Sequence, residues 1–180
     1  KTTNTHNFGA LPDLKILGTG TIRIASSYFP SGDFGNFLGA NGGTVEYYTE
    51  TAPSNIGAAF TLPTTYTSGA VTNITNYCNL VLSAATGKNI TLPNTDLLVY
   101  KDFNTSVSGT SISGVARFNT ANAARTFSVN GNINITKGTL EFINTNAAAQ
   151  NNVSTLGDIS VSSGATFDVG ATNAATSTLS

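Results

Sequence analysis

Short segments that alternate apolar and polar side chains recur along the chain, each directly after a glycine. The clearest copies are Gly138-Thr139-Leu140-Glu141-Phe142, Gly43-Thr44-Val45-Glu46-Tyr47 and Gly20-Thr21-Ile22-Arg23-Ile24. Alternation with a period of two is typical of a half-buried strand, and glycine permits the turn that precedes it. A unit this small cannot bury its apolar face alone. The recurrence therefore predicts stacked copies that share one core.

Glycines also define the length of the repeat. Gly131 is equivalent to Gly157 and Gly138 to Gly164, so the repeat is about 26 residues long, which suits one coil of a parallel β-helix. Strand alternation then predicts which apolar side chains face the core. These are Val129, Ile133, Ile135, Ile159 and Val161.

We therefore predict an all-β fold, a right-handed parallel β-helix (β-solenoid) with long loop insertions and almost no α-helix. Residues 1–180 form a single β-solenoid segment, which we expect to be part of a longer repetitive protein. The coils are irregular over residues 1–125 and most regular over residues 126–170. Roughly seven coils at about 4.8 Å each predict a rod near 35 Å long.

Three loops interrupt the predicted ladder, at residues 25–41, 51–75 and 144–155. Loops of this size in a compact repeat cover an end of the core, pack as an arm or bind a ligand.

Composition limits the function classes. Only 9% of the residues are charged, against about 25% in ordinary domains, and the formal net charge is -1. The basic residues are scattered singly, which argues against nucleic acid and against a polybasic membrane anchor. No apolar run approaches 18 residues, so we predict no direct membrane insertion. The single cysteine, Cys78, cannot form an internal disulfide, and we predict an inward apolar role for it.

Several blocks resemble a known repeat pattern, in the same order. They are Gly42-Gly43-Thr44-Val45-Glu46-Tyr47, Tyr77-Cys78-Asn79-Leu80-Val81-Leu82-Ser83, Gly87-Lys88-Asn89-Ile90-Thr91-Leu92, Val129-Asn130-Gly131-Asn132-Ile133-Asn134-Ile135 and Gly138-Thr139-Leu140. The pattern, GGTVEY … Y-x-NL-x-LSG-x-G-x-KTL … VNGNLTI-x-GGTL, belongs to very large surface adhesins of gliding bacteria and related type IX-secreted proteins. The resemblance covers about half of the chain. The insertion at residues 51–75 and the stretch at residues 96–119 depart from it.

The resemblance implies a secreted protein at the bacterial cell surface, where such repeats form filaments that the gliding motility machinery carries along. Its implied partners are neighbouring repeats of the same chain and a surface polysaccharide or other cell-surface ligand. The motif itself is scaffold, and no catalytic residue or cofactor comes with it.

A polysaccharide-active β-helix enzyme, a lyase or hydrolase, is an alternative that needs paired carboxylates, or a base beside metal-binding acids, in one groove. Glu46, Glu141 and Asp168 occupy equivalent positions after glycine corners and could align as an outward carboxylate ladder. Stacked like charges repel, so we interpret them as solvated strand positions and predict no enzyme activity. The arginines are too dispersed to predict a groove: Arg23, Arg117 and Arg125.

The densest aromatic group lies within residues 28–48. Exposed rings beside Asn and Ser would form a sugar-stacking platform, whereas buried ones would fill an irregular coil or cap one end of the core. We favour the second reading and keep the group as the glycan-binding candidates. They are Tyr28, Phe29, Phe34, Phe37, Tyr47 and Tyr48.

The same region offers Asp33, Asn36 and Asn41 as oxygen ligands for calcium. Calcium takes about six to eight oxygens, and one carboxylate among amides would bind it weakly. We therefore commit to no metal and no cofactor.

The sequence thus predicts a structural or adhesive segment that extends and presents a binding surface. Besides the enzyme, an antiparallel β-sandwich carbohydrate-binding module remains an alternative, since many short strands with glycine turns also fit that class. The direction of neighbouring strands decides between sandwich and solenoid.

Overall fold

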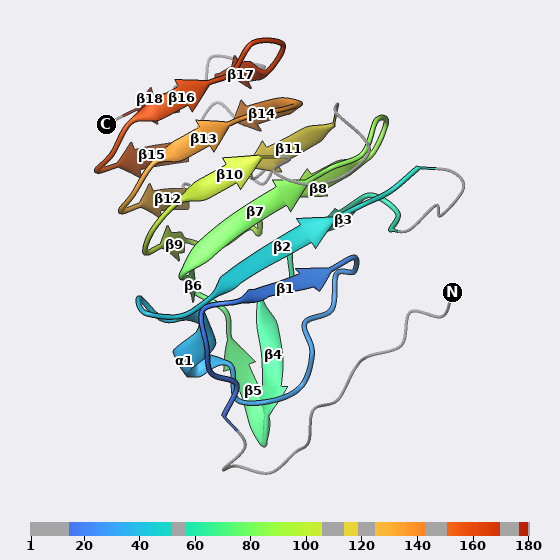
Figure 1. Cartoon of the computed structure of the whole chain (residues 1–180), viewed down its shortest axis with the longest axis vertical. Coiled ribbons are helices and arrows are strands. Elements are labelled where there is room, and N and C mark those ends of the chain that lie inside the picture. The colour runs from blue at the N-terminus through green and yellow to red at the C-terminus, as the bar shows by residue number, and fades with distance from the viewer. Residues whose placement is uncertain are drawn as a thin grey trace.

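The chain folds into parallel strands stacked in about five turns of a β-solenoid (Figure 1). Three sheets run along the axis, and almost no helix is present among the described residues. The computed structural model describes residues 15–51, 57–105, 114–118, 125–142, 151–169 and 177–179. The predicted all-β parallel β-helix is confirmed.

The first sheet is the longest, and all its neighbouring strands are parallel. Its inward column runs from Val45 through Leu80 and Phe103 to Ile133, in direct register. Its strands, in spatial order, are β1 (Thr21–Ile24), β2 (Thr44–Tyr48), β7 (Asn79–Ser83), β10 (Phe103–Thr105), β13 (Ile133–Ile135) and β16 (Ile159–Val161).

The other two sheets complete each coil with one strand apiece. The second sheet contains β3 (Phe60–Thr61), β8 (Asn89–Thr91), β11 (Val115–Phe118), β14 (Thr139–Phe142) and β17 (Thr166–Asp168). The third contains β6 (Asn76–Tyr77), β9 (Leu97–Val99), β12 (Arg125–Val129), β15 (Asn151–Thr155) and β18 (Ser177–Leu179).

In Figure 1 the first sheet faces the viewer and runs from left to right. The chain climbs from the blue end to the red end and returns behind through the other two sheets, so the winding is right-handed. The predicted repeat is confirmed in the last coils, where Ile133 pairs with Ile159, 26 positions further on.

The prediction of seven coils was wrong. Successive short strands such as β7, β8 and β9 lie on three different sheets of one coil, so the number of strands exceeds the number of coils about threefold. With five complete coils and β1 as an additional first rung, the first sheet rises about 24 Å at about 4.8 Å per step. The third predicted loop was also wrong in part, because Asn151–Thr155 forms β15; residues 144–150 lie outside the described residues.

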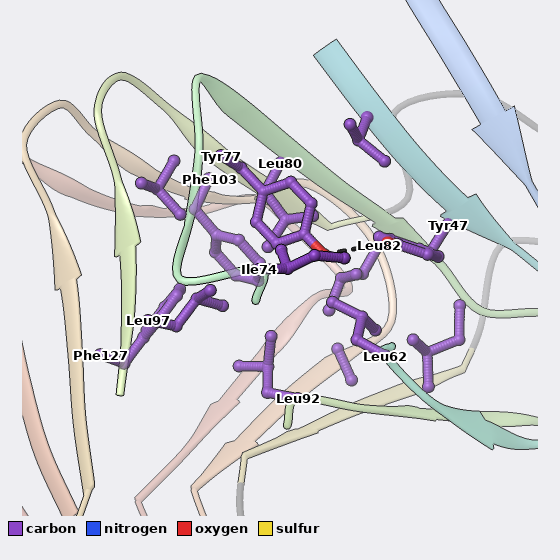
Figure 2. Packing of buried hydrophobic residues seen from close by; sticks show 14 of the residues in the cluster. Tyr47, Leu62, Ile74, Tyr77, Leu80, Leu82, Leu92, Leu97, Phe103 and Phe127 are labelled. Atoms are coloured by element: carbon purple, nitrogen blue, oxygen red, sulfur yellow. Dashed lines mark hydrogen bonds between the residues drawn. The ribbon is translucent and has the colours of Figure 1, made fainter. Parts of the chain in front are cut away.

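The core fills the inside of the coils, as alternation requires. Ile133, Ile135 and Val129 are at most 1% exposed, which confirms their predicted inward placement. Ile159 is half-buried and Val161 is 48% exposed, because they lie on the last rung. Figure 2 shows part of this core, with side chains from several coils meeting around the axis.

The insertion at residues 25–41 covers the end of the core next to β1 and β6. It contains the only helix among the described residues, α1 (Gly35–Leu38), and Asn76 donates a hydrogen bond of 2.8 Å to the carbonyl oxygen of Leu38. Cys78 is fully buried beside it, which confirms its predicted burial, but its Sγ lies 3.4 Å from the carbonyl oxygen of Ala40 and so faces the insertion, outside the hydrophobic core cluster.

The predicted insertion at residues 51–75 was wrong in part, because β3 lies within it and pairs with β8 as a rung of the second sheet. The rest contains a two-stranded arm, β4 (Thr65–Ser68) and β5 (Ala70–Asn73). This arm is the only antiparallel strand pair among the described residues. It packs at the same end of the solenoid as α1 (Figure 1). Since every other pairing is parallel, the β-sandwich alternative is wrong.

Glycines form stacked corners between the third and first sheets and before the second sheet. Gly138 and Gly164 precede β14 and β17 with φ of 70° and 79°, a conformation that glycine adopts without a Cβ clash. A Cβ at Gly138 would lie 2.5 Å from the carbonyl oxygen of Gly114 in the coil below, whereas a Cβ at Gly164 would meet nothing within 4 Å. Glycine is therefore required at position 138 both by the backbone conformation and by the close approach of the coil below.

The two corners make a matched pair for mutagenesis. We expect both Gly164→Ala and Gly138→Ala to cost roughly 1–2 kcal/mol from the left-handed backbone. Gly138→Ala should cost about 1–3 kcal/mol more, since the new methyl group meets a backbone carbonyl that cannot turn away. Unfolding free energies from urea titration would measure the difference, and equal costs would contradict the stacked corner.

Candidate functional surface

The strongest polar cluster on the outside of the solenoid joins the first three strands of the first sheet. Arg23 Nε lies 2.8 Å from Glu46 Oε2, and Ser83 Oγ donates to Glu46 Oε1 at 2.9 Å. The guanidinium of Arg23 also lies 4.1 Å from the ring centroid of Tyr48. The hydrogen bond to Glu46 raises the pKa of Arg23 above its ordinary value. The cluster therefore connects three successive strands of the first sheet through the carboxylate of Glu46.

Glu46 is 4% exposed, so its prediction as a solvated strand position was wrong. Its side chain points outward from the strand, but the neighbouring Arg23 and Ser83 cover it. A buried carboxylate is tolerated only when it is paired and hydrogen-bonded, as it is here.

The predicted carboxylate ladder forms only in part. Glu141 and Asp168 are register neighbours on the second sheet, but Glu46 lies on the first sheet. The prediction failed because the same glycine motif precedes strands at two different corners of the coil. Arg117 flanks Glu141 on its other side, with Nε 3.0 Å from Oε2, and so offsets part of the repulsion.

Most of the aromatic glycan candidates lie in the core. Phe29, Phe34, Phe37 and Tyr47 are at most 6% exposed. Phe29 and Phe34 pack edge to face at 4.9 Å, and Tyr66 of the β4–β5 arm joins them. Stacking on a sugar would require these four rings to leave the core.

Two candidate rings remain accessible. Tyr28 is 60% exposed, and Tyr48 is half-buried with its face occupied by Arg23. Glycan binding stays a prediction, and Tyr28 is the residue with which to test it.

A pair of buried tyrosines connects the first and third sheets inside the core. The hydroxyl groups of Tyr47 and Tyr77 are 2.9 Å apart, and both side chains are fully buried (Figure 2). Burial raises the pKa of each well above 10, and the neighbouring Tyr77 raises that of Tyr47 further. The pair is neutral at ordinary pH.

The calcium candidates lie in and beside the insertion that covers the core end. Asp33 Oδ1 accepts a hydrogen bond of 3.1 Å from the backbone N–H of Gly35, while Asn36 and Asn41 are exposed. Calcium binding there stays a prediction. Within the described ranges, no group of three or more His, Cys, Asp or Glu could hold a metal ion.

A ladder of Asn and Asp side chains at the corner before the first sheet escaped the sequence analysis. In three successive coils a side-chain oxygen accepts the backbone N–H of the equivalent residue one coil later. Asn79 accepts from Asp102 at 3.3 Å, Asp102 from Asn132 at 2.8 Å, and Asn132 from Asp158 at 2.9 Å. An Asn or Asp before each apolar-polar-apolar strand is the signal that could have revealed it.

Comparison with known protein families, curated proteins and solved structures finds no match to this chain. Among the helices that the structure describes, none has the length and apolar character needed to cross a membrane.

The tyrosine pair predicts a loss of stability in alkali. Because the folded pKa of Tyr47 and Tyr77 lies above the unfolded value near 10, their contribution is present below pH 10 and is lost as pH rises through the folded pKa. Melting midpoints between pH 8 and 12 should fall more steeply for the wild type than for the Tyr47→Phe/Tyr77→Phe variant. Parallel curves for the two proteins would contradict the coupling between ionisation of the tyrosine pair and unfolding.

The Arg23–Glu46 pair should show measurable coupling. Arg23→Met leaves a buried carboxylate short of one partner, and we expect it to cost about 1–3 kcal/mol of unfolding free energy. A double-mutant cycle with Glu46→Gln should give a coupling energy of about 1 kcal/mol. The Arg117–Glu141 pair is the control, with Arg117→Met and Glu141→Gln, and should give less because the side chain of Glu141 is more exposed than that of Glu46, at 15% against 5%. A coupling energy of zero at low salt would show that the Arg23–Glu46 pair does not help to hold the strands in register.

Proposed function

We propose that this chain is a structural and adhesive segment of a secreted bacterial cell-surface adhesin, which extends and presents a binding surface. The proposal includes its localisation at the cell surface, export by type IX secretion and a role in gliding motility and cell adhesion. It rests on the residue blocks that resemble adhesin repeats and on the geometry below.

The observation that carries the proposal is the uninterrupted parallel stacking from β1 to β16. Each rung of the first sheet pairs in register with the next, so the coils add along one axis. A stack of this kind lengthens by repetition without changing its cross-section. Such geometry suits a protein whose task is to span distance and display its outer faces.

The contacts of three described acidic residues favour scaffolding over catalysis. Glu46 is bound by Arg23 and Ser83, and Asp102 and Asp96 accept backbone N–H groups of the next coil. A general acid or base needs a carboxyl group that can reach a substrate. These three are committed to contacts between coils.

Ligand contact, if the segment makes it directly, is best sought at Tyr28. Its ring is exposed beside Ser27, and an exposed ring of this kind can stack on a sugar face. The ligand class proposed is a cell-surface polysaccharide.

The test is a panel of bacterial surface polysaccharides assayed for retention and for release of reducing ends. We expect at least one polysaccharide to be retained without release of sugar. Tyr28→Ala should weaken retention at least several-fold, since the stacking ring is lost. Val71→Ala is the matched control, because Val71 is 73% exposed on the β4–β5 arm and should leave retention unchanged.

Each other outcome has a clear meaning. Release of reducing ends would replace the proposal with the polysaccharide-active enzyme. Absence of retention on every polysaccharide would remove the adhesive part and leave only a spacer.

A further inference from the structure

The β4–β5 arm ends in a strand edge that pairs with no described residue. β4 is an inner strand, because it pairs with β5 on one side and the carbonyl oxygen of Thr67 accepts a hydrogen bond of 2.8 Å from the N–H of Gly32 on the other. β5 has only β4 as its neighbour within the described part of the chain. It is therefore the outermost strand of the arm.

The hydrogen-bonding pattern of the arm shows which backbone groups face this free edge. The N–H of Ile74 donates to the carbonyl oxygen of Thr64 at 2.7 Å, next to the first residue pair of the arm. Hydrogen-bonded and non-hydrogen-bonded pairs alternate along an antiparallel ladder. Val71 and Asn73 therefore belong to non-hydrogen-bonded pairs, and their N–H and C=O groups point away from β4.

The side chains divide the arm into two faces. Tyr66 is 7% exposed and packs on Phe29 and Phe34, so its face covers the end of the core. Thr72 pairs with Tyr66 and lies on this covering face. Val71 lies on the opposite face and is 73% exposed. A strand that pairs with β5 would cover part of this exposed valine.

Native sheets usually protect such an edge with lysine, proline or a β-bulge, and β5 has none of these. No charged residue lies between Glu50 and Lys88 in the sequence, so the whole arm is neutral. The charged residues Lys15 and Asp33, which pair as an isolated bridge, lie outside the arm. A charged partner would find no opposite charge on β5, so the edge favours an uncharged strand.

The sequence of β5 is complementary to itself. Around a two-fold axis at Thr72, Val71 of one copy lies opposite Asn73 of the second copy, and these two residues exchange both of their backbone hydrogen bonds. The two threonines at position 72 lie opposite each other, which is a favourable cross-strand pair. This register satisfies every backbone group that Val71 and Asn73 turn to the free edge.

We propose that the free edge of β5 is a homophilic contact, where a second copy of this chain pairs antiparallel through residues 70–73 and joins the two arms into one sheet. Figure 1 places the arm at the end of the solenoid opposite the last coil, with β4 and β5 along the long axis, so the coils of the two copies point away from each other. The proposal uses only the contacts of the arm and does not rest on the proposed function.

The size of the contact sets its strength. Each copy contributes a strand of 4 residues, which is small against the roughly 1,200–2,000 Å² of a stable interface. We therefore expect a weak dimer that forms as the protein concentration approaches the millimolar range.

Disulfide cross-linking tests the register. In the paired arms the Cα atoms of the two residues at position 72 lie about 4.5 Å apart, within the range of a disulfide, whereas those at position 70 lie about 13 Å apart. With oxidised glutathione, Thr72→Cys should form a covalent dimer at least tenfold faster than Ala70→Cys, as measured by non-reducing electrophoresis. Cys78 is fully buried and does not compete. Equal rates for the two variants would overturn the register.

A pair of variants at Val71 tests the backbone contact. Val71→Pro removes an N–H that faces the free edge and leaves the hydrogen bonds between β4 and β5 in place, whereas Val71→Thr keeps this N–H. In sedimentation equilibrium, Val71→Thr should associate like the wild type, and Val71→Pro should associate at least tenfold more weakly. Amide exchange at Ile74 checks that the arm is intact in both variants. Equal association would assign the dimer to another surface and overturn the proposal.

A wild type that stays monomeric up to the millimolar range would also overturn the proposal. If that monomer binds an uncharged threonine–asparagine peptide, with a shift of the Val71 amide signal, the edge accepts a different extended chain and not a second copy. Polysaccharide retention is measured separately at micromolar protein concentration, so failure of the homophilic contact and failure of the adhesive function are distinguishable.

Discussion

Parallel hydrogen bonding between successive coils is the constraint on which the structure depends. A single coil has no internal partner for the N–H and C=O groups along its strands, so it is stable only against a neighbour. The requirement fixes direction, register and repeat at once, because a shift of one residue would turn the inward column of Val45, Leu80 and Phe103 toward water. Side chains that lie between coils, such as Asn132 and Glu46, strengthen the same register.

The sequence predicts the class of fold well because alternation and glycine corners are local signals. Gly131 and Gly157 lie one above the other, and Ile133 pairs with Ile159 as their spacing requires. The number of coils could not be predicted in the same way. A short strand such as β8 (Asn89–Thr91) has the same alternating pattern whether it begins a coil or continues one. Only the three-dimensional stacking assigns it to a sheet.

The outer surface was harder to predict, because burial there depends on long-range neighbours. Phe34 and Tyr66 are 32 positions apart in sequence yet lie together, which confirms the favoured interpretation that most of the aromatic group belongs to the core, although the sequence did not show which rings stay exposed. Glu46 reads as a solvated acid until Arg23 and Ser83 are placed beside it. The proposed cell-surface role still rests on the resemblance of the repeat blocks and on the geometry of the stack.

The two ends of the solenoid differ, and this difference gives assembly a direction in time. The aromatic lid of Phe29, Phe34 and Tyr66 precedes all the coils from β7 onward in the sequence, so a ribosome releases it before those coils. Once that lid is in place, each later coil can wind onto a finished template as it emerges. Folding would then proceed vectorially, with each coil adding to the preceding one before the later coils have been made.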